Sequence, residues 1–239
     1  MTGELRAKIQ VVLLVALVIA ATRTAYILHQ RYEDAHPSAK GEISIGKPLD
    51  PDYYVTPRKL YPYDLKSAQE LAKQPAWVRL GYAAVYFPYN PATHHADFGH
   101  PAGKFQPLEK LQVEKVVTDV APGVSERQLM AVFTKAGSAY AFSVGNVSND
   151  QYHFYGTDML FIEDPHQLYR HWPSEVWQAI DQHQVKVGMN ELQASMAIGL
   201  GIPQTPGDFG NRILNYPNDG HPVTVTFQGG KVVDVKSGT

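Results

Sequence analysis

The sequence predicts an α+β protein with an apolar N-terminal helix, a β-rich middle and an end made of helices and strands. Three observations predict this. A run of apolar residues begins at Ile9. Between Trp77 and Ile162, apolar and polar residues alternate in short runs, which is the period of strands. After Asp164 the pattern changes to capped helices and a final strand pair. The chain therefore divides into an N-terminal segment (1–31), a proline-rich linker (32–66), a β-rich domain (67–164) and a helix–helix–β domain (165–239).

The composition predicts a folded core and excludes several kinds of chemistry. Of the 239 residues, 44% are hydrophobic and 18% are charged, which is a low charged fraction for a globular protein. The formal net charge of −2 argues against a nucleic-acid-binding protein, which normally presents a basic face. There is no cysteine, which excludes disulfides, thiol catalysis and zinc–thiolate sites.

The N-terminal segment has the length of a membrane span. As one helix, residues 9–28 would measure about 30 Å, which matches the hydrocarbon core of a bilayer. Arg6 and Lys8 precede it and favour a cytoplasmic N-terminus. We therefore predict a single-pass inner-membrane protein that contacts the membrane through residues 9–28 and carries its body in the periplasm. The alternative is a cleaved signal peptide, because Val18 and Ala20 fit the small-residue cleavage pattern.

The linker ends at a short predicted helix. Prolines recur through residues 32–65, which indicates an extended spacer or a strap on the surface of the body. Ser67 and Glu70 have the spacing of a capping box and predict the start of a helix. That helix is expected to end before Pro75.

The middle of the chain predicts a small antiparallel sheet. Residues 135–138 have the composition of a hairpin turn. The following strand should place Tyr140, Phe142 and Val144 on one face. Strands are predicted within 77–89, 111–117, 129–134, 140–144, 152–155 and 159–162. Five or six short strands are typical of a small barrel or curled sheet, and the strand count alone suggests an SH3-like barrel.

Helix caps mark the beginning of the last part. Asp164 can cap a helix that has Pro165 in its first turn. Asn190 and Gln193 predict a second capped helix. The chain then ends in a strand pair with a turn at Gly229-Gly230. The order is therefore two helices, one strand and a hairpin.

Four C-terminal motifs resemble the SmpA/OmlA (BamE-like) family. They are Val-Lys-Val-Gly-Met at 185–189, Gly-Leu-Gly-Ile-Pro at 199–203, Ile-Leu-Asn-Tyr at 213–216 and Val-Thr-Val-Thr-Phe-Gln-Gly-Gly-Lys-Val-Val at 223–233. The resemblance implies two helices packed on a three-stranded antiparallel sheet, and a role in protein–protein contact. The founding member is a lipoprotein that assists outer-membrane β-barrel assembly. This chain lacks the lipidated cysteine and adds a β-rich domain. The whole chain is also similar to uncharacterised anchored envelope proteins of acidobacteria-like bacteria.

One loop carries the candidate metal ligands. His94, His95, Asp97 and His100 place three imidazoles and one carboxylate within a short stretch. Such a set binds Zn²⁺ or Cu²⁺ if the loop bends around the ion, and zinc is the cofactor that this alternative would use. The alternative is a polar surface loop whose histidine or aspartate side chains bond to the backbone.

A second polar cluster comprises Asp158, Glu163 and Asp164, for which helix capping competes with acid–base chemistry.

The leading hypothesis is therefore a non-enzymatic, membrane-anchored envelope protein that serves as an interaction or scaffold module. Residues 184–239 would contact other envelope proteins. One alternative is a metal-dependent envelope enzyme that uses the histidine loop. The other is a small-ligand binder with a pocket in the β-rich domain, and neither alternative involves nucleic acid.

Overall fold

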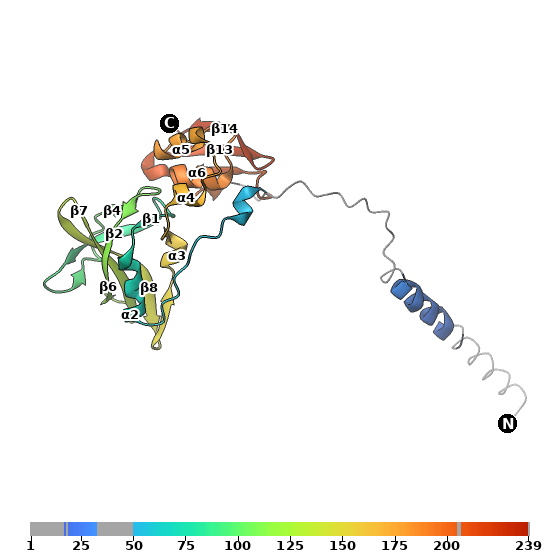
Figure 1. Cartoon of the computed structure of the whole chain (residues 1–239), viewed down its shortest axis with the longest axis horizontal. Helices are drawn as coiled ribbons and strands as arrows, with labels where there is room; N and C mark the ends of the chain where they lie inside the picture. The colour runs from blue at the N-terminus through green and yellow to red at the C-terminus, as the bar shows by residue number, and fades with distance from the viewer. Residues whose placement is uncertain (1–16, 18, 33–49, 205–206, 239) are drawn as a thin grey trace, which may run out of the picture. The chain divides into compact units, whose positions relative to one another are not determined.

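The computed structural model describes residue 17 and residues 19–32, 50–204 and 207–238 (Figure 1). The chain divides into two compact units, 1–50 and 51–239. Each is described by itself, and the second unit, which we call the body, contains the sheets and the sites discussed below. As predicted at the coarse level, it is an α+β fold with antiparallel sheets and few helices.

The N-terminal unit corrects the prediction of a membrane span. Leu17 and residues 19–32 are helical, while the first part of the predicted 9–28 segment lies outside the described residues. Within the part of the chain that the structure describes, no helix is long and apolar enough to cross a membrane. The described helical residues include Arg23, whose charge is costly in the hydrocarbon core of a bilayer. The prediction of a single-pass inner-membrane protein is therefore wrong on this finding.

The body begins with a strap, which we define as residues 51–64. It consists of the 3-10 helix η1 (Pro51–Tyr54) and an extended stretch that leads to α2 (Leu65–Ala68) and η2 (Gln69–Lys73). The cap of α2 is Asp64, three residues before the predicted cap. Its carboxylate accepts a 2.7 Å hydrogen bond from the Ser67 backbone N–H. Hydrogen bonds from the Ser67 hydroxyl and from the Ser67 backbone N–H lower the pKa of the Asp64 carboxyl.

Two sheets build the β-rich part. The three-stranded sheet has the order β10 (Leu160–Phe161), β1 (Ala76–Val78), β5 (Lys110–Leu111). The larger sheet follows the order β3 (His95–Ala96), β2 (Val85–Asn90), β8 (Ser138–Ser148), β7 (Arg127–Lys135), β6 (Val113–Val120), while β4 (Gly103–Lys104) pairs with β2 and β9 (Gln151–Phe154) pairs with β8. All of these pairs are antiparallel.

Tight turns set the registers of the larger sheet. Ala136 and Gly137, both with positive φ, join β7 to β8 in the predicted hairpin. Asn149 and Asp150 do the same between β8 and β9. Two central residues with positive φ give a turn whose twist matches that of the flanking strands.

The first core lies against one face of the larger sheet. Phe105, Phe133 and Phe142 are buried there with ring centroids 4.9–5.8 Å apart. Val144 is also buried in this core and Tyr140 packs against it, as predicted from the alternation along β8. A smaller core, centred on Tyr89, Met130, Val132 and Ala141, lies on the opposite face.

The C-terminal part forms the second core. The helices are α3 (Gly156–Met159), α4 (Pro165–Leu168), α5 (Ser174–Asp181) and α6 (Glu191–Ile198). A third sheet has the order β11 (Ile202–Pro203), β12 (Ile213–Tyr216), β13 (Val223–Gln228), β14 (Lys231–Ser237), with η3 (Asn218–Gly220) before β13. α5 and α6 share this core with β12–β14. The predicted caps Asp164 and Asn190 and the Gly229-Gly230 turn are confirmed.

Strand alternation joins the two cores into one body. In β1, Val78 is buried in the first core, whereas Trp77 packs against the second. In β10, Leu160 belongs to the first core and Phe161 to the second. Because successive side chains of a strand point to opposite faces, one short sheet serves both cores.

Candidate functional site

The structure does not bring the predicted metal ligands together. His94 Nδ1 lies 3.4 Å from the Tyr89 hydroxyl. The imidazole of His100 instead bonds to its neighbour Asp97, with Nδ1 2.9 Å from Oδ2. Among the described residues, which include the whole 94–100 loop, no three His, Asp or Glu side chains form a group that could hold a metal ion. The hypothesis of a metal-dependent enzyme therefore gains no geometric support.

Asp119 organises this loop from β6, which stands at the opposite end of the strand order from β3. Its side chain is 1% exposed, and Oδ1 lies 2.7 Å from Nδ1 of His95. The carboxylate also accepts hydrogen bonds from the backbone N–H groups of Ala96 (2.6 Å) and Val120 (2.8 Å). A buried carboxylate that accepts several hydrogen bonds fixes the segments that donate them. The histidine loop is thus tied to the sheet by one aspartate.

We expect Asp119→Ala to lower the free energy of unfolding by about 2 kcal/mol, because two backbone donors lose their acceptor in a buried position. His95→Ala, which removes an exposed donor, should cost less than about 1 kcal/mol. Urea unfolding of both variants measures the difference. Equal midpoints for the two variants would show that the carboxylate does not hold the loop.

The acidic residues singled out in the sequence are separated and have structural partners. Asp164 caps α4 through the backbone N–H of His166. Glu163 accepts a 2.8 Å hydrogen bond from the backbone N–H of Arg58. Asp158 pairs with Lys59 at 3.6 Å. Two of the three therefore attach the strap to the body.

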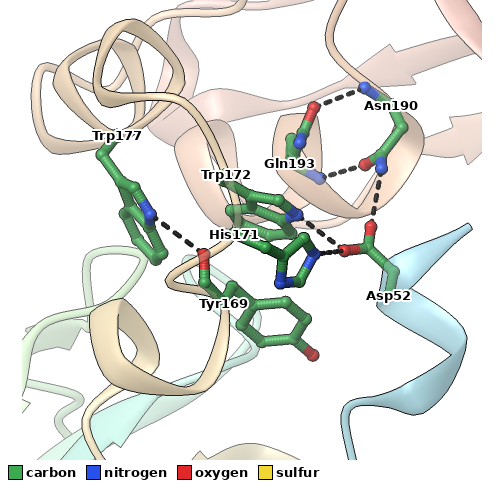
Figure 2. Close-up of polar contacts among 7 residues, drawn as sticks. All are labelled: Asp52, Tyr169, His171, Trp172, Trp177, Asn190 and Gln193. Atoms are coloured by element: carbon green, nitrogen blue, oxygen red, sulfur yellow. Dashed lines mark hydrogen bonds and ion pairs between the residues drawn. The ribbon is translucent and has the colours of Figure 1, made fainter.

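Asp52 is the principal attachment point of the strap (Figure 2). Its Oδ1 accepts hydrogen bonds from Trp172 Nε1 at 2.6 Å and lies 2.7 Å from His171 Nε2. The other oxygen accepts a 2.8 Å hydrogen bond from Asn190 Nδ2. Asn190 caps α6 in a reciprocal box with Gln193. One carboxylate thus joins the strap to the aromatic turn before α5 and to the N-terminus of α6.

Sequence reasoning missed this cluster because its members are far apart in the chain. Asp52 and His171 are separated by 119 positions. The one local signal was the cap at Asn190. It predicted the start of a helix but did not indicate which group the Asn190 amide would bind. Only folding brings the strap beside α6.

The segment between α6 and β12, which we call the 199–212 segment, is described for residues 199–204 and 207–212 and carries exposed apolar side chains at the edge of the third sheet. Phe209 is 74% exposed, Ile202 57% and Leu200 45%. Ile202 lies on β11, which is an edge strand. Gly199 ends α6 with a φ of 86°, and a Cβ at this position would lie 2.6 Å from the carbonyl oxygen of Gly81. Residue 199 must therefore be glycine for the segment to leave the helix along this path.

A buried ion pair holds the far end of the same segment. Glu191 receives two hydrogen bonds from the Arg212 guanidinium, at 2.6 and 3.1 Å. It also accepts a 2.9 Å hydrogen bond from the backbone N–H of Gly210. Arg212 in turn lies over the Phe209 ring at 5.1 Å. Burial, together with the Glu191 charge, raises the pKa of the nearby Tyr216 hydroxyl. The exposed apolar residues are therefore displayed on a fixed frame.

These features define a two-core α+β protein with an apolar edge held by buried polar contacts. The chain matches no protein-family model, and comparisons with curated proteins and with solved structures found no match.

Proposed function

We propose that the body is a non-catalytic protein-interaction module, and that the 199–212 segment is its contact surface. The observation that carries the proposal is the exposure of three apolar side chains, Leu200, Ile202 and Phe209, on one short segment. Large apolar side chains that are exposed on one segment are unfavourable in water, and clusters of them mark contact sites. Aromatic residues in particular are enriched among the residues that dominate binding energy.

The frame around this surface favours binding. A surface that is already ordered loses less conformational freedom on association. The Glu191–Arg212 pair and the Gly210 contact order the end of the segment that carries Phe209. A partner would therefore meet these side chains with little rearrangement of the backbone.

The architecture around the segment supports a BamE-like assignment of residues 165–239, which we propose together with the contact role. α5 and α6 share one core with the antiparallel strands β12–β14. The family arrangement has two helices and three strands, and the two-residue strand β11 would be an addition at its edge. We also propose that the middle part is SH3-like, because its short strands pair in one antiparallel sheet.

Site-specific photocrosslinking tests the contact surface. A photoreactive phenylalanine analogue at position 209 in the full chain is expected to crosslink a recurring protein in cells of the source organism. Val124, 43% exposed in the turn between β6 and β7, is the matched control position. The crosslink should be lost when Ile202→Asp is added, since the partner would then meet a charge. Equal crosslinking at 124 and 209, or persistence after Ile202→Asp, would refute the proposed surface.

A further inference from the structure

The edge strand β9 presents backbone groups to a groove. Its two-residue turn from β8 makes Ser148–Gln151 and Asn146–His153 the hydrogen-bonded pairs. The N–H and C=O groups of Tyr152 and Phe154 consequently point away from β8. No described residue forms a backbone hydrogen bond with either of these two residues on that side. An edge of this kind is a template for another strand.

The strap forms the opposite wall of this groove. The groove has a volume of about 390 Å³ and lies between β9 and residues 59–62. In Figure 1 the strap runs past the β8–β9 region without regular structure on its way to α2. Tyr61, which is 81% exposed, lines the groove, and the Lys59–Asp158 pair joins its two walls. The strap therefore flanks the edge of β9 without pairing with it.

We propose that this groove binds an extended peptide segment, which adds a strand to β9. The outward groups of Tyr152 and Phe154 would supply main-chain hydrogen bonds, as in strand-addition complexes. Residues of the peptide that lie beside Tyr152 and Phe154 would share the face that packs against the first core. The intervening residues would lie on the face of His153, which is exposed. Period-two alternation thus specifies a partner with apolar residues at every second position and polar residues between them.

The strap adds a contact that strand pairing alone lacks. An inserted peptide would be enclosed by β9 on one side and by the strap on the other. Tyr61 offers a rigid aromatic surface whose ordering costs little conformational entropy. The Asp52, Arg58 and Lys59 contacts hold the strap on the N-terminal side of residues 60–62. On the C-terminal side, the backbone N–H of Tyr63 donates a 3.1 Å hydrogen bond to the Ser67 hydroxyl. This site is independent of the 199–212 surface, so each can fail without the other.

Two strap tyrosines provide a matched pair for the test. Tyr61 lines the groove, whereas Tyr63 is equally exposed at 78% and does not line it. A library of linear heptapeptides is selected on the immobilised full chain, and a selected peptide is synthesised. Its affinity should fall about tenfold in Tyr61→Ala, the typical effect of losing one aromatic contact, and less than about twofold in Tyr63→Ala. Phe209→Asp, on the other proposed surface, should leave this affinity unchanged.

Residue-resolved amide hydrogen exchange supplies the readout that identifies strand addition. In the free protein the amides of Tyr152 and Phe154 should exchange fast, and those of Gln151 and His153 slowly, because only the latter bond to β8. Bound peptide should slow exchange at Tyr152 and Phe154. The proposal is overturned if the library yields no binder, if Tyr61→Ala and Tyr63→Ala bind equally, or if exchange at Tyr152 and Phe154 does not change.

Discussion

Replacing Glu191 with alanine is expected to lower the free energy of unfolding by about 4 kcal/mol, the largest effect that we predict for a single side chain. Glu191 is 8% exposed, and it accepts both hydrogen bonds from Arg212 and one from Gly210. Without it, the half-buried Arg212 guanidinium loses its counter-charge and the buried N–H of Gly210 loses its acceptor. Urea denaturation followed by circular dichroism measures the change.

Two further variants separate charge from packing at this position. Glu191→Gln keeps the size and one acceptor, so its effect should lie between those of wild type and Glu191→Ala. Glu70→Ala is the surface control, because the Lys73–Glu70 pair is exposed and should contribute less than about 1 kcal/mol. If Glu191→Ala destabilised the protein no more than Glu70→Ala, the 199–212 frame would not depend on the buried pair.

Asp52→Ala is expected to lower the free energy of unfolding by about 3 kcal/mol. The carboxylate is 14% exposed and bonds with Trp172, His171 and Asn190, of which the Trp172 side chain is the most deeply buried partner. Hydrogen bonds to a charged acceptor contribute more than neutral ones, and removal of that acceptor leaves the indole N–H unsatisfied. Thermal and urea unfolding report the loss, and tryptophan fluorescence should shift because Trp172 gains water.

Asp234→Ala is the control for this variant. Its side chain is 47% exposed and pairs with the exposed Lys236 at 3.3 Å, so its loss should leave stability within about 0.5 kcal/mol of wild type. A second consequence concerns the strap. Once Asp52 is removed, amides near the N-terminus of α6 should exchange faster, because Asn190 loses the bond that orients its capping side chain. Unchanged exchange there would show that the strap does not support α6.

Much of the fold was predictable from the sequence because its signals are local. Asp164 with Pro165, and Asn190 with Gln193, each specify a helix start within a few residues. The hairpin around residues 135–138 follows from a turn sequence between two alternating runs. The α2 cap was placed at Ser67 instead of Asp64, because both side chains take part in one capping box. These elements are decided by neighbouring residues, so a linear sequence contains the information.

The sites were much less predictable. His94, His95, Asp97 and His100 were candidate metal ligands only if the loop bent around an ion, with a polar surface loop as the alternative. In the structure, Asp119 holds His95 from 24 positions away. The membrane span was predicted from a run of apolar residues, and the described helix does not meet the length and apolarity that a span requires. The partner of His95 depends on a residue that is distant in the sequence. Whether a segment can span a membrane depends on the length and apolarity of the whole helix.

The sequence alone determined the class of fold, the positions of most caps and turns, and which face of β8 enters the core. These depend on backbone preferences and on the periods of helix and strand, which act over a few residues. The tertiary structure decided that Asp52 joins the strap to α6, that Glu191 secures the 199–212 segment, and that the edge of β9 faces a groove. The physical reason is that exposure and hydrogen-bond partnership depend on which distant segments pack together, and local pattern does not contain that information.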